Sequence, residues 1–208
     1  MIAAISLMRR QDVVTLSQFR RHWLDVHGPL VCAFAGLRAY VQCHPIASPA
    51  MNARARSMRI DGFPILFFND DDDRRKAHGS PEMAACNVDS RLFVGAVSRV
   101  VTDVETIVPA GSSVGRVSLL TLYPDGVAAD TVAADAARLA ELPGLRALAR
   151  YHVREQGAAP ASTVPHLQIA VGAATQARFD GVVDLECALD GWDQTDAARF
   201  VVEEHWMV

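Results

Sequence analysis

The sequence predicts an α+β fold of two βαββαβ repeats whose antiparallel sheets pack against each other to form an α/β barrel. Apolar patterns typical of strands and helices follow one another in the order strand, helix, strand, strand, helix, strand. The same order recurs after a short linker of small residues at positions 109–113. Several strands are apolar at odd and even positions alike, as in residues 65–68, so both faces of each sheet require burial.

The first repeat begins with a buried strand at residues 2–8 and continues with a helix whose start is clearly marked. Thr15 is a suitable N-cap, and Gln18, three residues later, completes a capping box. Val14 and Phe19 supply a hydrophobic staple around that cap. The apolar face of the helix follows at spacings of three and four residues and consists of Phe19, Trp23, Val26 and Leu30.

Pro29 limits this helix, because it lacks a backbone donor and disfavours helical geometry at Gly28. We therefore expect a break or kink at His27-Gly28, after which the chain resumes as a further helical turn. The rest of the repeat is predicted as a strand, a loop, a strand, a polar helix or turn, and a strand, at residues 37–43, 45–59, 63–68, 72–85 and 99–107.

The second repeat follows the same plan. Its segments are predicted as a strand, an alanine-rich helix, a strand, a loop, a strand, a short helix and a closing stretch, at residues 117–122, 127–142, 145–155, 157–164, 182–189, 193–200 and 201–207. Two local similarities support a duplication: Gly36-Leu37-Arg38-Ala39 resembles Gly144-Leu145-Arg146-Ala147, and Ile60-Asp61-Gly62-Phe63 resembles Phe179-Asp180-Gly181-Val182.

The two repeats define two predicted domains, residues 1–109 and 114–208. Each βαββαβ unit covers one sheet face with its helices and leaves the other face bare. The linker is short enough for one chain to pack the two bare faces together, which would make an intramolecular pseudo-dimer. Association of two chains as a homodimer stays open. A pocket is expected between each sheet and its own helices.

Composition excludes several classes of protein. Lys and Arg number 20 against 24 Asp and Glu, so the formal net charge is -4 and nothing attracts a nucleic-acid backbone. No apolar run reaches the roughly 20 residues that span a bilayer. The first positive charges follow a short apolar stretch, the reverse of a signal peptide. With four cysteines and no CxxC pair, we expect a cytoplasmic protein with reduced thiols and no membrane partner.

One combination of motifs in the first half resembles EthD-type proteins of the dimeric α/β barrel (ferredoxin-like) superfamily. The motifs are Phe19-Arg20-Arg21-His22-Trp23 with His27-Gly28-Pro29, then Gly36-Leu37-Arg38-Ala39-Tyr40-Val41-Gln42, and later Asp61-Gly62 with the aromatic strand after it. The resemblance covers roughly residues 1–107. The second half has no His-Gly-Pro and looks like a diverged copy.

The resemblance implies a fold and a range of chemistry. Similar barrels include methylmuconolactone isomerases, polyketide cyclases and decarboxylases, and haem-degrading monooxygenases. Many of them act on small aromatic or lactone substrates without a metal. In isomerase-like relatives the histidine at the helix end and the tyrosine of the next strand are pocket groups, and these correspond to His27 and Tyr40.

Elementary chemistry gives the predicted catalytic residues His27, Tyr40 and Asp61 plain roles. An imidazole titrates near neutral pH, so His27 is suited to remove a proton next to a carbonyl and return it elsewhere. A phenol on the adjoining strand, Tyr40, would donate a hydrogen bond to the enolate oxygen. Asp61 would orient the imidazole or act as a second acid–base group. The alternatives are a helix cap for His27, an ordinary strand aromatic for Tyr40 and a turn for Asp61.

Trp23, His44 and Phe67 are predicted to line the substrate pocket. Trp23 is otherwise a core anchor, and His44 is otherwise a loop residue before Pro45. No metal site is predicted, because His22 and His27 lie five positions apart, about 140° round a helix. His78 is a poor candidate for a haem ligand because its segment is polar, so no cofactor is predicted.

The leading hypothesis is a cofactor-independent enzyme of small-molecule catabolism or secondary metabolism. It would isomerise, cyclise or decarboxylate a lactone, phenol or polyketide-like substrate by acid–base chemistry. One alternative is an accessory protein that binds a small ligand in the same pocket without chemistry. The other is a monooxygenase.

Overall fold

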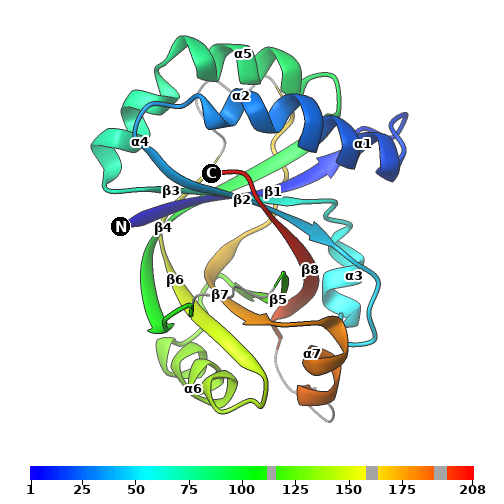
Figure 1. The fold of residues 1–208 in the computed structure, drawn as a ribbon, viewed down its shortest axis with the longest axis vertical. Helices are drawn as coiled ribbons and strands as arrows, with labels where there is room; N and C mark the ends of the chain where they lie inside the picture. Colours follow the sequence, from blue (N-terminus) through cyan, green and yellow to red (C-terminus); the bar gives the residue numbers. More distant parts are fainter. Residues whose placement is uncertain (112–115, 158–163, 190–195) are drawn as a thin grey trace.

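The computed structural model describes residues 1–111, 116–157, 164–189 and 196–208, whose strands close into a barrel with helices on its outside (Figure 1). The strands are β1 (Ile2–Arg10), β2 (Leu37–Pro45), β3 (Phe63–Phe68), β4 (Val94–Val108), β5 (Val117–Pro124), β6 (Leu145–Gly157), β7 (Val171–Phe179) and β8 (Ala198–Trp206). The helices are α1 (Leu16–His22), η1 (Trp23–His27), α2 (Gly28–Cys32), α3 (Ala53–Met58), α4 (Asp71–His78), α5 (Pro81–Ser90), α6 (Ala129–Ala140) and α7 (Val182–Ala188).

The barrel consists of two four-stranded antiparallel sheets with the same internal order. Around the barrel the strands run β1-β3-β2-β8-β5-β7-β6-β4. The first half therefore contributes β4-β1-β3-β2 and the second half β8-β5-β7-β6, which is the same arrangement twice. The predicted α+β fold with two βαββαβ repeats in a barrel is confirmed.

Two further strand pairs join the sheets and close the barrel within one chain. Strand β2 pairs with β8, and the long strand β4 pairs with β6. All eight strands thereby have neighbours on both sides. This closure removes the unpaired strand edges that two separate sheets would expose.

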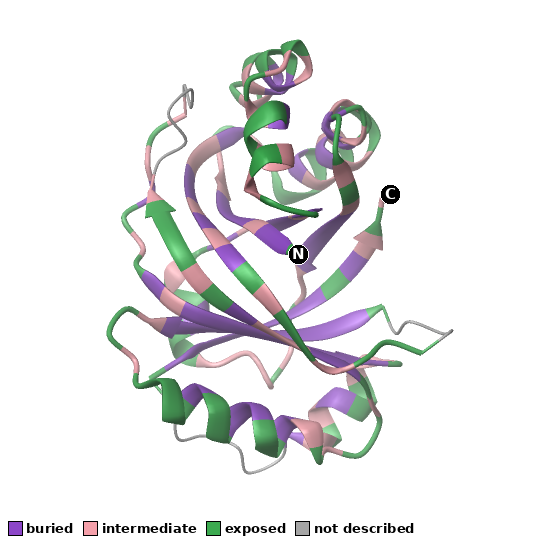
Figure 2. Ribbon diagram, turned by 90° about the vertical axis from the view of Figure 1, so that its left-hand side faces the viewer, coloured by how far each residue is buried: buried purple, intermediate pink, exposed green. Residues whose placement is uncertain are grey.

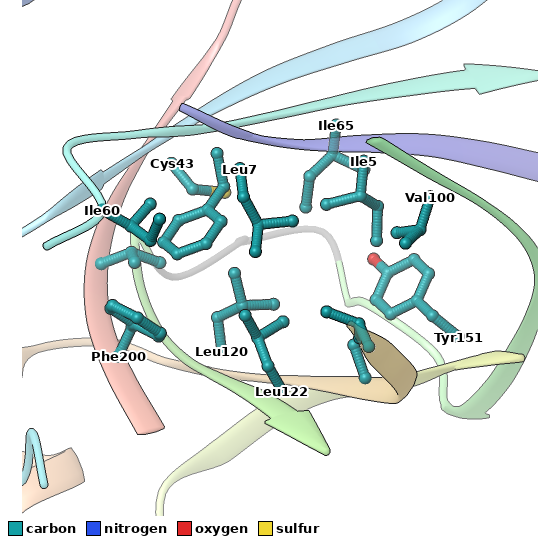
Figure 3. Close-up of a cluster of buried hydrophobic side chains, with 14 of the residues drawn as sticks. Ile5, Leu7, Cys43, Ile60, Ile65, Val100, Leu120, Leu122, Tyr151 and Phe200 are labelled. Carbon is teal, nitrogen blue, oxygen red and sulfur yellow. The ribbon is translucent and has the colours of Figure 1, made fainter. Parts of the chain in front are cut away.

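The core of the barrel is built from the inward side of every strand. Along β1 the residues Ala3, Ile5 and Leu7 point into the barrel, because side chains alternate between the two faces of a strand. They meet Leu120, Leu122, Phe200 and other apolar side chains of the opposite sheet (Figure 3). The strands are accordingly buried along most of their length, whereas the helices expose their outer faces (Figure 2).

Helices cover the outside of each sheet. Figure 1 shows α1, α2, α4 and α5 over the sheet of the first half, with α6 and α7 on the opposite side of the barrel. The capping box at Thr15 and Gln18 forms as predicted, with the Gln18 backbone N–H donating to Thr15 Oγ1 at 3.2 Å. Helices thus occupy the faces that the barrel core does not use.

The helix that contains His27 continues through Pro29 instead of breaking. Its middle turn, η1, is π-helical, and the Gly28 N–H donates to the carbonyl of Trp23, five residues earlier. The wider turn accommodates Pro29, which would otherwise clash with a carbonyl of the preceding turn. Of the expected break or kink at His27-Gly28, the break is absent, and the distortion takes the form of a π-helical turn that ends at His27 before α2 begins at Gly28.

The glycines of the first predicted similarity have the same role in both halves. Gly36 and Gly144 adopt φ values of +80° and +78°, the left-handed region that favours glycine. Each glycine directly precedes the leucine that begins a strand, Leu37 in β2 and Leu145 in β6. A β-bulge follows each leucine.

The second predicted similarity is wrong in register. Phe63 begins β3, whereas Phe179 ends β7. The true counterpart of Phe179 is Phe68, since Leu37 pairs with Phe68 as Leu145 pairs with Phe179. The following residues also correspond, because Arg38 bonds Asn69 as Arg146 bonds Asp180.

Three sequence-based assignments need correction. The predicted loop at residues 45–59 contains α3, which Asn52 caps. The predicted strand at 182–189 is helix α7, and the third strand of this half is β7 at Val171–Phe179. Of the predicted helix at 193–200, residues 193–195 lie outside the described residues, and residues 198–200 begin β8. The segment 182–189 alternates like a strand, but its buried leucines, Leu185 and Leu189, have helical spacing.

Several predictions about organisation stay predictions. The domain boundaries at 109 and 114 are untested, and residues 112–115 lie outside the described part of the chain, as do residues 158–163 of the predicted loop at 157–164. A homodimer, a cytoplasmic location and the lack of a nucleic-acid partner are likewise untested. None of the helices described here has both the length and the apolar character to cross a bilayer.

We predict that Gly62→Ala destabilises the protein by about 1–3 kcal/mol, because an added methyl group would overlap the ring of Trp23. Urea unfolding followed by circular dichroism measures the loss. The matched control is Gly157→Ala, where the added methyl group would meet no atom within 4 Å. Equal stability of both variants would contradict the tight packing at Gly62.

Candidate active site

A cavity lies between the sheet of the first half and its helices, the position expected for a pocket. Its volume is about 70 Å³, several times the roughly 10–15 Å³ that one water needs. The polar lining residues are Ser6, His27, Tyr40, His78, Asn87, Ser90 and Arg99. The apolar ones include Met8, Val31, Phe34, Leu66, Met83, Val94 and Val97. The cavity thus combines an apolar wall with a few groups capable of chemistry.

His27 enters the cavity wall from the π-helical turn and is held by an acid. Its Nδ1 lies 2.8 Å from Oδ2 of Asp89, which stands near the end of α5. The other carboxylate oxygen, Oδ1, lies 2.9 Å from Nε2 of His22. A carboxylate accepts hydrogen bonds, so Asp89 fixes the proton of His27 on Nδ1 and leaves Nε2 as the basic nitrogen.

The surroundings of His27 keep its imidazole neutral. Burial lowers the pKa of His27 below its ordinary value, and the hydrogen bond and charge of Asp89 oppose this effect. The nearby Arg99 adds to the lowering. At neutral pH the ring is therefore in its unprotonated form, which is the form that a general base requires.

Tyr40 lies on β2 and presents a hydroxyl with both acceptor positions used. Trp23 Nε1 donates to Tyr40 Oη at 2.9 Å, and Gln42 Nε2 donates to the same oxygen at 3.1 Å. Burial raises the pKa of Tyr40 well above its ordinary value, so the phenol keeps its proton. With two donors already bound, the remaining capacity of the hydroxyl is to donate.

Trp23 and His44 support Tyr40 from behind instead of lining the cavity. The ring of Trp23 stacks on that of His44 with centroids 4.6 Å apart. His44 Nε2 lies 3.1 Å from Oε1 of Gln42. Burial, with His205 and Arg20 nearby, lowers the pKa of His44 to about 3, so His44 is neutral and donates to Gln42. The chain from His44 through Gln42 to Tyr40 fixes the phenol.

The backbone of Tyr40 is held by the end of the second half. The Tyr40 N–H donates to the carbonyl of Val208 at 2.9 Å, and the Met207 N–H donates to the carbonyl of Tyr40 at 2.9 Å. The Met207 side chain also packs close to Gly28, next to His27. Residues 207–208 therefore belong to the surroundings of the site.

Two predicted site residues lie elsewhere. The carboxylate of Asp61 accepts the backbone N–H of Arg10 at 2.9 Å and forms an ion pair with the Arg10 side chain, so it fixes the end of β1. Phe67 points into the barrel core, on the opposite face of the sheet from the cavity. Neither residue lines the cavity around His27.

Asp89 takes the orienting role that the sequence assigned to Asp61. The signal for Asp89 is present in the sequence, because Met83, Cys86 and Asp89 follow at spacings of three on the buried side of α5. An acidic residue on an otherwise apolar helix face needs a partner. Its partners, His22 and His27, are distant in sequence, which hides the pair from a reading of local patterns.

The second half does not repeat this arrangement. Leu148 follows Leu145 by three positions, as Tyr40 follows Leu37, so an apolar side chain replaces the phenol. The space between that sheet and its helices is filled largely by Leu139, Phe179, Leu185 and other apolar residues. Among the described residues, its buried polar contact is a hydrogen bond from Tyr123 to Asp135 of α6, so the pairing of a histidine with an acid is not repeated there.

The barrel interior also contains charged groups, but they satisfy one another. Glu204 accepts hydrogen bonds from Arg178, Gln176, Ser118 and Trp206. Its ion pair with Arg178 has an N–O distance of 2.9 Å. With so many donors around one carboxylate, this group is structural. Within the described residues, no three His, Cys, Asp or Glu side chains are arranged to hold a metal ion.

Comparison with known structures agrees with the fold. An anthrone oxidase-like protein matches over 99% of this chain and 93% of its own, with a TM-score of 0.63 and 12% identity. A candidate monooxygenase from Fusobacterium nucleatum matches over 98% of this chain and 91% of its own, with a TM-score of 0.60 and 7% identity. Another, from Lactobacillus acidophilus, matches over 99% and 94%, with a TM-score of 0.57 and 8% identity.

These matches define the class of protein as a ferredoxin-like α/β barrel completed within one chain. Residues 11–96 match the model of the EthD domain family. The matched region contains His27, Tyr40 and Asp89. No curated protein matches the sequence.

We predict that Asp89→Asn lowers the pKa of His27 further. The substitution removes the charge and the hydrogen bond that oppose burial, while the positive charge of Arg99 remains. NMR titration of the His27 ring protons measures the shift. An unchanged or raised His27 pKa in the variant would show that Asp89 does not control this ring.

Proposed function

We propose that the protein is an enzyme that moves a proton within a small lactone, phenol or polyketide-like substrate. The observation that carries the proposal is the cavity wall itself, where a neutral imidazole held by Asp89 and a protonated phenol line the same space. The reaction class is isomerisation, cyclisation or decarboxylation without oxidation of the substrate. The EthD domain match over residues 11–96 agrees with a role in small-molecule chemistry.

The isomerisation requires a substrate with an acidic C–H bond next to a carbonyl group. His27 Nε2 removes a proton from that carbon, and the electrons of the broken C–H bond move into the carbonyl to form an enolate. Tyr40 Oη–H donates a hydrogen bond to the enolate oxygen. His27 then returns the proton to a different carbon. One C–H bond breaks and another forms, so atoms and electrons balance.

Asp89 makes the charged intermediate state of His27 accessible. When Nε2 takes a proton, the ring becomes an imidazolium in a buried place, which is costly without a counter-charge. The carboxylate at 2.8 Å from Nδ1 supplies that charge. His22, on the other oxygen, is more exposed and holds the carboxylate from the solvent side.

Oxygenation is the second candidate function. The structures that match over the full chain include an anthrone oxidase-like protein and candidate monooxygenases. Removal of a phenol proton by His27 would be the first step of such a reaction as well. Oxygen uptake with an anthrone would favour this candidate, whereas binding of ligands without any turnover would favour an accessory protein.

We predict that His27→Ala lowers the rate of proton transfer about a hundredfold or more, since it removes the general base. Tyr40→Phe should lower it about a hundredfold by removing one donor to the oxyanion. The probes are α-angelica lactone, whose double bond migrates on proton transfer, and β-tetralone and acetylacetone, which exchange protons with D2O. NMR follows all three reactions.

The control for these variants is His152→Ala, which removes an exposed histidine of the second half and should leave the rate unchanged. Circular dichroism checks that all variants fold. A wild-type protein that accelerates none of the three probes above buffer, or a His27→Ala variant with the full wild-type rate, would contradict the proposed function.

We predict that the rate falls in acidic solution as one proton binds, with an apparent pKa below that of an ordinary histidine. The reason is that the pKa of His27 lies below 6.5 and the base is active only when unprotonated. A pH–rate profile on α-angelica lactone measures this behaviour. A rate that rises as the pH falls below 6.5 would assign the base role to another group.

A further inference from the structure

Arg99 brings a positive charge to the cavity, and no acid among the described residues pairs with it. It lies on β4 among the cavity-lining residues and is half-buried. In the described part of the chain, no carboxylate comes within 4 Å of its guanidinium and no hydrogen bond from its side chain is made. By contrast, Arg178 is buried and Arg74 is half-buried, and each forms an ion pair with a carboxylate.

The acids near the cavity are already committed to other groups. Asp89 is shared between His22 and His27. Asp71 is paired with Arg74 and Arg75. The groups that sense the charge of Arg99 are His27, His78 and Cys86. Burial and Arg99 lower the pKa of His78 to about 4, so that ring is neutral and offers no countercharge.

An isolated guanidinium in a half-buried place is unfavourable for the empty protein. Burial lowers the pKa of Arg99, which means that folding disfavours its charged form. A group of this kind is retained at a cost in stability when it serves a ligand. Its planar fork of donors matches a carboxylate, which it can bind through two parallel hydrogen bonds.

We propose that Arg99 binds a carboxylate of the substrate, which is therefore a small organic acid with an apolar body. This inference rests on the proposed function, because it takes the cavity to be the substrate site. The apolar part of the ligand would lie along Met8, Phe34, Leu66 and Val97, which line the same space. Arg99 and His27 line one cavity, so a bound acid would present its carbon chain to the imidazole.

The experiment measures binding, so it does not depend on turnover. Acetate, crotonate and benzoate are titrated into the protein next to their neutral amides, and dissociation constants are obtained by calorimetry and NMR. We expect at least one acid to bind more tightly than its amide. Arg99→Met keeps an unbranched side chain but removes the charge and the donors, and it should weaken binding of that acid about tenfold or more while leaving binding of the amide unaffected.

Two further variants separate the outcomes. Arg21→Met removes an exposed charge of α1 outside the cavity and should leave acid binding unchanged. Arg99→Lys keeps the charge but loses the fork, and it should bind the acid with intermediate affinity. It also serves as the test variant if Arg99→Met does not fold.

The empty Arg99→Met protein should melt at the same temperature as the wild type or higher, because an unpaired charge is removed. The proposal is overturned if no acid binds the wild type more tightly than its amide, or if the acid binds Arg99→Met as well as the wild type. Acid binding that depends on Arg99, in a protein that accelerates no proton transfer, would support this inference and refute the proposed function.

Discussion

Each four-stranded sheet of this protein has two apolar faces, and its own helices can cover only one of them. The remaining face of each half is buried against the other half, and strands β2 with β8 and β4 with β6 seal the edges. This requirement explains the duplicated chain, the short linker and the full burial of residues such as Ile5, Leu7 and Leu120. The rest of the architecture depends on it.

The same requirement decides where a cavity can form. The barrel interior is tightly filled, and its charged pair, Glu204 with Arg178, is fully engaged. The helix-covered face of the first sheet does not have to be filled by the other half. Polar residues at alternate positions of its strands, among them Tyr40 and Arg99, can therefore face a cavity. In the second half, largely apolar side chains fill the corresponding space.

Local sequence patterns predicted much of the fold. The capping box at Thr15 and the strands around Tyr40 and Phe67 are short-range features, and they appear as expected. In the segment at 182–189, charged residues at alternate positions imitate the period of a strand. Packing against the sheet instead selects the helical face of Leu185 and Leu189. Packing, which the sequence does not display, overrides local period here.

The candidate site was only partly predictable for the same reason. His27 and Tyr40 stand in motifs that a resemblance can transfer, and both line the cavity. Asp89 acquires its role through His27, 62 positions away, and Arg99 lines a cavity that residues of several distant elements complete. Asp61 and Phe67 had suitable chemistry and neighbourhood in the sequence, but one secures a strand end and the other faces the core. Side-chain direction across a sheet separates these cases.

The contact between Tyr40 and residues 207–208 gives the second half a purpose that its own apolar interior would not suggest. The end of the second half extends the sheet beside β2 and places Met207 against Gly28. It thereby holds the backbone of Tyr40 and packs next to His27 in the first half. The two halves therefore share one strand order but are not interchangeable, because the last residues of the second half complete the hydrogen bonding of a strand in the first.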